Sequence, residues 1–563
     1  MLKKDYSGWS KEDLVREIRK LEKRKKYGVV WEDKPEEVAE LCKEKLPVLV
    51  EDKDREILTD TKSPTNILIE GDNYHALSVL NYTHKGKADV IYIDPPFNTG
   101  NKTWKYNNNY VERDDEFRHS KWISFMNKRL RLSKNLLNTS GIIVVAVDDY
   151  EMHTLRLLMD EIFGEDNRLG TIVVVHNPRG RNDDKYFATM HEYMLVYAKN
   201  TSFASVGYFA LTEEDQDSFS MEDGISPFNL TSFMRTGNNS DRSTRPKLFY
   251  PIYYESEKNK LSLDKTKNSV ELLPINSAGR EKTWRWGEQT FLEKKDTELV
   301  VRKVKDIYRI FKKRRLSDLK GKKPRSVWYN PRYDASSHGI MLLQDMFGKT
   351  DVFPYPKSIW TVFDILEIVT KKDSLIVDFF AGSGTTGHAV SLLNERDKGN
   401  RKFILCTNNE NNICTEVCYP RISKIIKGYK NKSKEELPGV GGNLKYFKTD
   451  FVDAEATDAN KKKLVDKSTE MLCLKEDCFN NVVAEQHFKL FTNSQGKSLG
   501  IVYDDDGIEP FKEQLKKWGK KFIVYVFSLD ESAREEEFED VQKLVELKPI
   551  PAVILNVYKR IFK

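Results

Sequence analysis

The chain has 563 residues and a mass of 65.6 kDa, too many for one ordinary domain of about 100–200 residues. Its 39% hydrophobic and 32% charged residues are the composition of a soluble globular protein. No apolar run approaches the ~18 residues of a membrane span, and the N-terminus lacks the apolar core of a signal peptide, so we expect a cytoplasmic protein. Six cysteines are too few for a disulfide framework in so long a chain, and we expect reduced thiols and no metal site.

The net charge of +6 is small beside 93 basic and 87 acidic residues, but the excess is concentrated. Between Val301 and Asn330, twelve basic residues accompany two acidic ones, with aromatic residues interleaved. Cations that pair with phosphates, beside rings that can stack on bases, favour a nucleic-acid surface. The alternative is a solvated helix face. The DNA-binding candidates are Lys312, Lys313, Arg314 and Arg315.

The first 60 residues are predicted to form a charged helical appendage. Ser10 and Asp13 resemble a capping box at a helix start, and apolar residues follow at helical spacing. A basic run at 23–26 comes next.

Between residues 61 and 200, apolar strands alternate with helices. The predicted strands are Ile67–Glu70, Asp89–Ile93, Ile142–Val147, Thr171–His176 and Tyr193–Ala198. The predicted helices are Tyr74–Leu80, His119–Leu137 and Tyr150–Phe163. Such alternation is typical of an α/β fold, with a mostly parallel sheet covered by helices.

The alternation lapses over residues 201–345, which are polar and irregular, and resumes over 346–450. The predicted elements there are a helix at Ser358–Val369, a strand at Ser374–Asp378, a helix at Gly387–Asn394 and a strand at Lys402–Cys406. We therefore expect one sheet interrupted by an inserted domain. Residues 451–563 are predicted to form a small separate α/β domain, because two further strands, Leu499–Tyr503 and Lys521–Phe527, flank a helix at Pro510–Trp518.

A glycine-rich turn follows the strand that ends at Asp378. Gly382 and Gly384 allow a tight turn, and the next helix offers its N-terminal amides to a ligand. The spacing is that of a phosphate-binding loop, but that motif needs Lys and then Ser or Thr where His388 and Ala389 stand, which argues against ATP. A strand-end acid followed by such glycines suits a small ligand that carries an amino acid and a nucleoside.

A second motif, Asp94-Pro95-Pro96-Phe97, ends the strand Asp89–Ile93. The prolines stiffen the turn and have no N–H, so its backbone presents hydrogen-bond acceptors, which suit an amino group. An aromatic ring beside those acceptors can stack on a base that has left the double helix. The alternative is a strand-end aspartate that caps a helix beside a rigid turn.

Together the two motifs resemble those of the S-adenosylmethionine-dependent DNA amino-methyltransferases. Asp94–Phe97 is similar to their DPPY tetrapeptide, with Phe for Tyr, and Asp378–Gly387 is similar to their cofactor loop, DxFAGSGTT. The catalytic motif comes first, as in the circularly permuted β group, whose target-recognition domain lies between the two halves. Three shorter segments also match in order: Gly71-Asp72, His191-Glu192-Tyr193 and Phe353–Lys357. Length, N-terminal helix and tail look most like the Mod subunit of type III restriction–modification systems.

The resemblance implies a Rossmann-like sheet with a catalytic half at 61–200, a target-recognition insert at 201–345 and a cofactor-binding half at 346–450. It implies methyl transfer from S-adenosylmethionine to N6 of a flipped adenine in double-stranded DNA. Asp94 and the Pro95 carbonyl would each accept a hydrogen bond from the amino group, and Phe97 would stack on the base. The catalytic residues are then Asp94, Pro95, Pro96 and Phe97.

The same resemblance assigns the cofactor's neighbours. Asp378 and the amides around Ala381–Thr385 would surround its methionine part, and Lys357 lies in the segment that meets its carboxylate. Glu410 would hold the ribose hydroxyls, and Asp72 would accept from the adenine amino group, cap the helix at Tyr74, or do both. The implied cofactor-binding residues are Asp72, Lys357, Asp378, Phe380, Ala381, Gly382, Ser383, Gly384, Thr385, Thr386 and Glu410.

A homodimer and a restriction subunit are the implied partners. The sequence has no GxxxxGK[ST] loop and no nuclease pattern that stands out, so ATP hydrolysis and cleavage would belong to another polypeptide. Three alternatives stay open: a solitary methyltransferase for adenine N6 or cytosine N4, methylation of a protein amide, and an inactive DNA-binding specificity subunit. Asp94 favours adenine, because the family has Ser there for cytosine N4.

Overall fold

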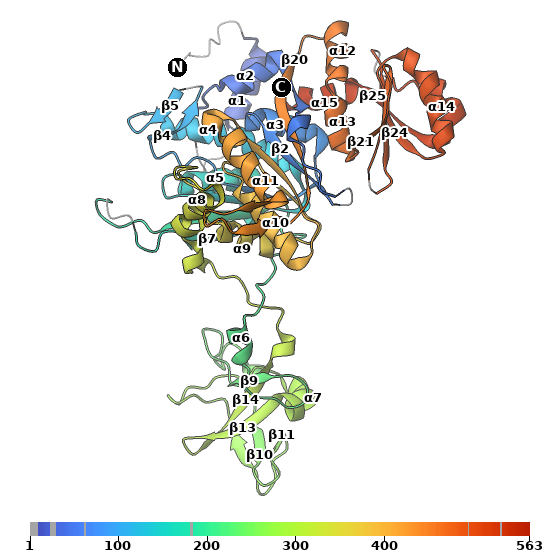
Figure 1. Cartoon of the computed structure of the whole chain (residues 1–563). Coiled ribbons are helices and arrows are strands. Elements are labelled where there is room, and N and C mark those ends of the chain that lie inside the picture. The colour runs from blue at the N-terminus through green and yellow to red at the C-terminus, as the bar shows by residue number, and fades with distance from the viewer. Residues whose placement is uncertain are drawn as a thin grey trace. The chain divides into compact units, whose positions relative to one another are not determined.

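The computed structural model describes residues 9–22, 30–60, 63–107, 109–180, 184–493, 495–529 and 532–562. They fall into two compact units, one of Met1–Gly207 with Arg325–Lys563 and one of Tyr208–Pro324 (Figure 1). The N-terminal residues 1–8 and the basic run at 23–26 lie outside the described residues. Within the described ranges, no helix combines the length and the apolar character needed to cross a membrane. All six cysteines are buried free thiols.

The larger unit is built on a ten-stranded sheet of order β1-β20-β2-β17-β16-β3-β6-β8-β7-β15. Its strands are β1 (Lys45–Glu51), β2 (Thr65–Glu70), β3 (Ala88–Ile93), β6 (Leu137–Val147), β7 (Arg168–Val175), β8 (His191–Ala198), β15 (Val327–Trp328), β16 (Leu375–Asp378), β17 (Lys402–Thr407) and β20 (Asn443–Asp453). The consecutive strands from β20 to β6 are parallel, whereas β1 and β8 run antiparallel to their neighbours. The predicted mostly parallel α/β sheet is confirmed.

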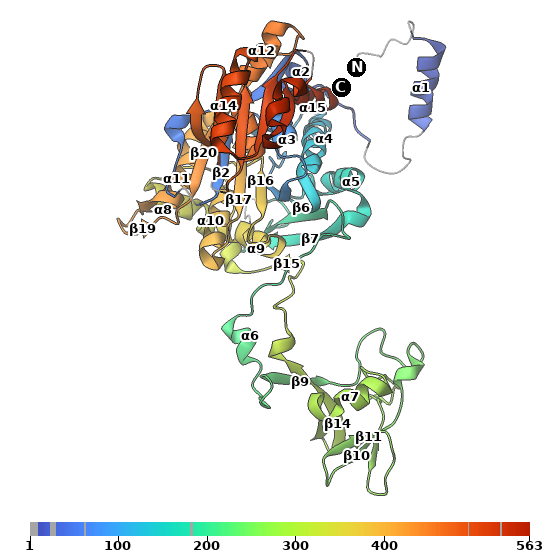
Figure 2. The same ribbon diagram turned by 90° about the vertical axis from the view of Figure 1, so that its right-hand side faces the viewer.

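Helices cover both faces of this sheet (Figure 2). One face carries α3 (Asn73–Thr83), α4 (Arg118–Leu136) and α5 (Met152–Phe163), and the other carries α9 (Ile359–Val369), α10 (Thr385–Asp397) and α11 (Tyr419–Lys427). The remaining elements of this region are α8 (Met341–Phe347) and two short hairpins, β4 (Asn101–Tyr106) with β5 (Asn109–Glu112) and β18 (Gly428–Lys430) with β19 (Glu436–Pro438). The apolar strands are buried because both faces are covered.

The N-terminal segment is only partly an appendage. Helix α1 (Lys11–Glu22) begins at the predicted capping box, where Ser10 and Asp13 exchange hydrogen bonds of 2.6 and 3.1 Å. After α2 (Glu37–Glu44), however, β1 joins the sheet edge by pairing with β20. The prediction missed this strand because charged residues flank its short apolar run, and Pro47 is tolerated there because β1 is an edge strand. The predicted boundary at 450/451 also falls inside β20.

The tail has a sheet of its own, of order β21-β22-β23-β24-β25. Its elements are α12 (Asp458–Asp466), α13 (Thr469–Glu476), β21 (Asn480–Ala484), β22 (Phe488–Thr492), β23 (Ser498–Val502), α14 (Ile508–Trp518), β24 (Phe522–Phe527), β25 (Val545–Ile550) and α15 (Ala552–Ile561). Helices α13 and α15 pack against α3, and the Tyr558 hydroxyl donates to the Pro47 carbonyl at 2.5 Å. The tail therefore belongs to the same compact unit as the ten-stranded sheet.

The smaller unit contains two three-stranded sheets, of order β11-β10-β12 and β13-β14-β9. Its elements are α6 (Glu213–Asp217), β9 (Phe228–Ser232), β10 (Ile252–Glu255), β11 (Lys260–Ser262), β12 (Val270–Leu272), α7 (Glu288–Glu298), β13 (Leu299–Val304) and β14 (Ile307–Arg315). An aromatic core that includes Phe233, Trp284 and Phe291 holds them together. Sequence periodicity did not predict these strands, because most of them are short and therefore contain few alternating apolar and polar positions.

Candidate active site

The two sequence motifs meet at one edge of the large sheet. Strands β3 and β16 are parallel neighbours, with Ile91 opposite Val377. Asp94 follows the end of β3, and Asp378 ends β16. Parallel strands bring their carboxyl ends to the same edge, where α/β proteins bind ligands. Residues far apart in the chain therefore form a single site.

Asp94 lies against a lysine, Lys357, whose side chain is 11% exposed. The Lys357 ammonium is 3.3 Å from the Asp94 carboxylate and also pairs with Glu192, whose side chain is 3% exposed. Glu192 is in β8, and its carboxylate lies 4.0 Å from His176 Nδ1. Sequence analysis assigned Lys357 to the cofactor and gave no role to Glu192. The feature that could have indicated Glu192 is a carboxylate near the start of a mostly apolar strand.

These charges determine the protonation of the site. Burial raises the pKa of Asp94 to about 6; Lys357 opposes the rise and Glu192 adds to it. Burial also disfavours the charged form of Lys357, but the two carboxylates raise its pKa above the usual value. The lysine thus stays cationic, and it favours an ionised Asp94 near neutral pH.

The turn that carries Asp94 is fixed from both sides. Trp122 in α4 donates its indole N–H to the Pro96 carbonyl at 2.7 Å. Asn98 is fully buried with φ 55° and donates to the Glu151 carboxylate at 2.5 Å. The Lys357 ammonium lies 4.4 Å from the centre of the Phe97 ring. Carboxylate and ring are therefore held side by side before any substrate arrives.

The glycine-rich turn is closed around Asp378. This buried carboxylate accepts from the Phe380 amide at 2.9 Å and from the Thr386 hydroxyl at 2.5 Å, and burial raises its pKa to about 7. Gly384 caps α10 with φ 80°, and a Cβ there would lie 3.1 Å from Cys418 Sγ. A side chain at this position would strain the backbone and crowd the turn.

A buried arginine supports the same turn. Arg421 in α11 is 0% exposed and donates to the Ser383 hydroxyl at 3.0 Å and the Thr385 hydroxyl at 2.9 Å. It also lies 3.2 Å from His388 Nδ1. Burial lowers the pKa of Arg421 to about 10. Sequence analysis missed it, because nothing in a helical Pro-Arg-Ile segment signals contact with a loop 36 residues away.

The other predicted cofactor residues are more dispersed. Asp72 caps α3 by accepting from the Tyr74 amide at 2.7 Å, which confirms the cap, and it lies 3.6 Å from Arg129. Glu410, just beyond β17, pairs with Lys105 at 2.5 Å.

A cavity of about 330 Å³ opens beside the glycine-rich turn. It is lined by Ile340, Leu343, Gln344, Asp351, Val352, Phe353 and Pro354. The Phe353 ring lies 3.6 Å from where a Cβ on Gly382 would stand. One lining residue of the cavity, Phe353, therefore lies next to the glycine-rich turn.

The basic run of the smaller unit is a hairpin, β13–β14, and not a helix face. Strand alternation divides its four candidate cations. Lys313 and Arg315 pair with Asp223 at 2.5 and 2.8 Å, and Arg315 also pairs with Glu298. Lys312 lies 5.2 Å over the Trp286 ring, and Arg314 is exposed. Of the four cations, only Lys312 and Arg314 are therefore available to a phosphate in this arrangement.

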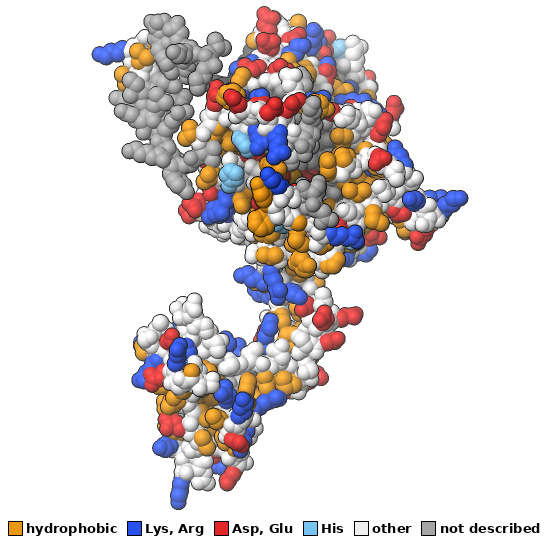
Figure 3. All heavy atoms as spheres, turned by 90° about the vertical axis from the view of Figure 1, so that its left-hand side faces the viewer, with side chains coloured by type: hydrophobic (Ala, Val, Ile, Leu, Met, Phe, Trp, Pro, Cys, Tyr) orange, Lys and Arg blue, Asp and Glu red, His pale blue; other side chains and the backbone are white. Residues whose placement is uncertain are grey.

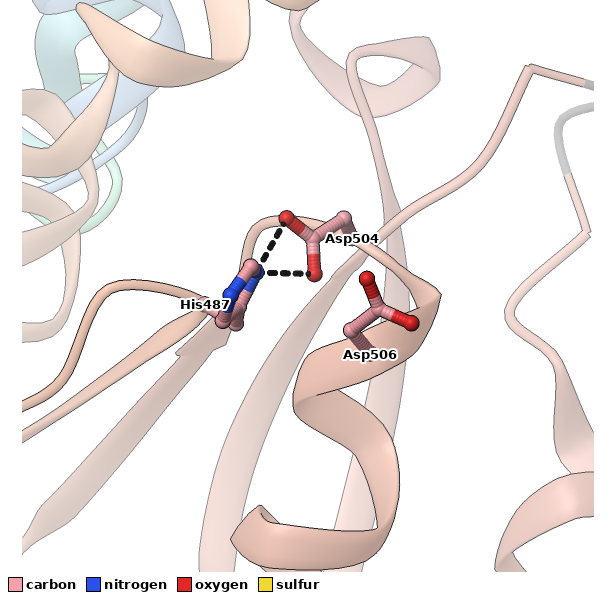
Figure 4. Close-up of side chains that lie close together, drawn as sticks. All are labelled: His487, Asp504 and Asp506. Atoms are coloured by element: carbon pink, nitrogen blue, oxygen red, sulfur yellow. Dashed lines mark hydrogen bonds and ion pairs between the residues drawn. The ribbon is translucent and has the colours of Figure 1, made fainter.

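One group of side chains in the described part of the chain has the donors for a metal ion. His487, Asp504 and Asp506 place their ligand atoms within 4.8 Å of one another (Figure 4). His487 precedes β22 and Asp504 follows β23, and the two side chains are 2.7 Å apart. Because these strands are antiparallel neighbours, the pair closes one end of their hairpin, which accounts for the contact without an ion.

Comparison with known proteins gives the family. The family model described as DNA methylase (N6_N4_Mtase) matches residues 88–417, more than half of the chain. The type III EcoPI Mod subunit of Escherichia phage P1 is 36% identical over 64% of this chain and 60% of its own length. The type II methyltransferase M.KpnI of Klebsiella pneumoniae is 33% identical over 70% of this chain and 93% of its own length.

Among solved structures, the M1.HpyAVI–SAM complex is 16% identical over 64% of this chain and 98% of its own, with a TM-score of 0.28. The sheet edge that holds Asp94 and Asp378, at the ends of neighbouring parallel strands, is the place where α/β proteins bind ligands. The chain belongs to the DNA methylase family. It spans about 60% of the length of the EcoPI Mod subunit.

Proposed function

We propose that this chain transfers a methyl group from S-adenosylmethionine to N6 of an adenine flipped out of double-stranded DNA. The observation that carries the proposal is the adjacency of β3 and β16, which brings the Asp94–Phe97 turn next to the glycine-rich turn. Membership of a DNA methylase family, and the similarity to the type III EcoPI Mod subunit and the type II methyltransferase M.KpnI, support it. The cofactor would supply an electrophilic methyl group.

In this proposal the chain's residues prepare the amine. The lone pair of an exocyclic amino group is delocalised into the base, so the nitrogen is a poor nucleophile. Asp94 and the Pro95 carbonyl would each accept a hydrogen bond from one of its two N–H groups and draw the nitrogen toward tetrahedral geometry. Phe97 would stack on the base, which offsets part of the few kcal/mol that flipping costs. The positive charge of Lys357, 3.3 Å away, favours the ionised form of Asp94. This form is needed because a protonated carboxyl group is a poorer hydrogen-bond acceptor than a carboxylate.

For the cofactor, we propose that Asp378 and the residues from Phe380 to Thr386 hold its methionine part, with Arg421 supporting their turn. Lys357, Asp72 and Glu410 remain proposed cofactor neighbours; Lys357 is within reach of Asp94 as well. We propose 201–345 as the target-recognition insert, in which the compact unit Tyr208–Pro324 lies. The circular permutation belongs to the same proposal.

As to its setting, we propose a modification subunit of a restriction–modification system, acting as a homodimer in the cytoplasm, with a restriction subunit as the candidate partner. The 93% coverage of M.KpnI favours a second candidate, a methyltransferase that needs no such partner.

Two measurements test these proposals. The purified chain is incubated with tritiated S-adenosylmethionine and, separately, with DNA, protein or RNA; label should enter DNA alone, and label in protein would refute the proposal. DNA from a host that expresses the chain is then sequenced with detection of modified bases. N6-methyladenine at one recurring sequence is expected, whereas N4-methylcytosine would correct the atom.

A further inference from the structure

Two adjacent aromatic side chains are exposed to solvent in the segment that connects β7 to β8. Tyr186 is 80% exposed and Phe187 is 90% exposed. The segment that carries them projects from the larger unit in Figure 1, and Figure 3, which looks onto that side, shows hydrophobic and basic side chains close together on this face. Single exposed apolar residues are ordinary, but two neighbouring rings on a projecting turn suggest a partner.

The base of this segment lies at the active site. Strand β7 ends at Val175, and β8 begins with His191 and Glu192. Glu192 pairs with Lys357, which in turn contacts Asp94. The aromatic residues are thus joined by a few residues of chain to the strand that borders the catalytic carboxylate.

The described part of the segment has internal order. The Met190 carbonyl accepts from the amides of His176 and Asn177, both at 3.1 Å. Gly180 has φ 74°, and a Cβ there would lie 2.7 Å from that of Ala188, so the two limbs approach closely.

The turn at the end of the second limb, Asp184–Thr189, is named here the aromatic turn. Asp184 accepts from the Thr189 amide at 2.7 Å, which closes it around the two rings. The Lys185 ammonium lies 5.1 Å from the centre of the Tyr186 ring. A cation beside exposed rings suits a polyanion with stackable bases better than the apolar face of another protein.

We propose that Phe187 enters the DNA duplex and stacks in the space left by the flipped target base, with Tyr186 and Lys185 against the adjoining strand. The inference rests on the proposed function. A base that leaves the helix exposes its neighbours, and proteins that distort DNA insert apolar side chains between base steps. Because every base has a flat face, an aromatic wedge acts on any flanking sequence.

The test uses Phe187→Ala, with Phe203→Ala as the matched control. Phe203 is also exposed, at 62%, but it lies beyond the opposite end of β8. The substrate is a duplex containing the site found by sequencing modified bases. Methylation is measured on the fully paired duplex and on one whose target base faces a mismatch, and 2-aminopurine at the target position reports flipping.

Phe187→Ala should lower kcat/KM on the paired duplex about 10- to 100-fold, the usual value of one stacked ring, and reduce the 2-aminopurine signal. On the mismatched duplex, where flipping is easier, the loss should shrink to a few-fold. Phe187→Tyr should retain activity, and Phe203→Ala should match wild type. Affinity for S-adenosylmethionine should be unchanged.

Activity of Phe187→Ala within about threefold of wild type on the paired duplex would overturn the inference while leaving the proposed function intact. An equal loss of kcat/KM on both duplexes would also overturn it, because a side chain that promotes flipping contributes less when the target base is already mispaired. A lower mass in solution without a change in flipping would make the aromatic turn a contact between copies of the chain instead. Wild type that methylates neither duplex would overturn the proposed function and the wedge together.

Discussion

The sheet edge of the candidate active site and the β13–β14 hairpin both contain clusters of charged side chains, but the two clusters differ in burial and pairing. At the edge, Lys357 lies between the carboxylates of Asp94 and Glu192, so partly buried charges of opposite sign shift one another's pKa. In the hairpin, Arg315 is neutralised by Asp223 and Glu298, while Arg314 on the same strand stays exposed. Charge buried among partners tunes protonation, whereas exposed charge is available to a polyanion. The number of basic residues in a segment does not distinguish the two.

The largest expected effect comes from removing the carboxylate that we propose to be catalytic. Asp94→Ala should lower the rate of methyl transfer by ~10²–10⁴, the usual contribution of such a group, because the amine loses its acceptor. Affinity for S-adenosylmethionine, measured by calorimetry, should change by no more than severalfold. Asp458→Ala, at an exposed aspartate in α12, is the control. Turnover within tenfold of wild type would contradict the catalytic assignment.

Gly384→Val should act on the cofactor and not on the amine. A branched residue at φ 80° is strained by about 1–2 kcal/mol and crowds Cys418, so the turn must move. Calorimetry should show at least a tenfold loss of affinity for S-adenosylmethionine, since 1.4 kcal/mol corresponds to a factor of ten. Gly519→Val places the same strain at φ 59° on a surface turn with nothing within 4 Å. Unchanged cofactor affinity in Gly384→Val would refute the loop assignment.

The paired charges at the edge predict a pH dependence with a definite sign. Asp94 has a pKa of about 6, so methyl transfer should fall as the pH drops through this range and the carboxylate is protonated. Lys357→Met removes the charge that lowers this pKa, and the acid limb should move to higher pH. Glu192→Gln removes a charge that raises it, and the limb should move to lower pH.

These opposite displacements separate charge coupling from a merely structural role. The measurement is the pH profile of kcat/KM for the three proteins at constant ionic strength. Displacements in the same direction, or equal losses at every pH, would show that Lys357 and Glu192 only hold the fold of the site.

The smallest effects should come from the β13–β14 hairpin, where two double variants separate the exposed cations from the neutralised ones. Lys312→Gln with Arg314→Gln should flatten the salt dependence of DNA binding by about 0.9 log–log units for each phosphate that is no longer neutralised, with little change in Tm. Lys313→Gln with Arg315→Gln should instead lower Tm, because Asp223 and Glu298 lose their partners. The methylated sequence should stay the same in both, since phosphate contacts position the protein and base contacts specify. An unaltered slope in the first variant would leave these cations without a role in DNA binding.

Much of the fold could be predicted because its signals are local. Helix α4 at Arg118–Leu136 and α9 at Ile359–Val369 lie within one residue of their predicted limits, since apolar periodicity and an N-terminal Ser358 cap are both short-range. The same reasoning missed β1 and the small sheets of Tyr208–Pro324, which are stabilised by pairing with distant strands.

The chemistry of the two turns can be deduced from local sequence, because Asp94–Phe97 and Asp378–Gly387 carry their acceptors, prolines and glycines within a few consecutive residues. Which groups surround these turns depends on how distant segments pack together. Lys357, which precedes α9, pairs with Glu192 at a distance of 165 positions, and Glu192 comes near Asp94 because β8 lies in the same sheet as β3, with β6 between them. Strand pairing likewise decided which cations of β14 are neutralised, since the carboxylate of Asp223 lies 92 positions from Arg315. Contacts across such distances depend on how strands pack, which no local pattern encodes.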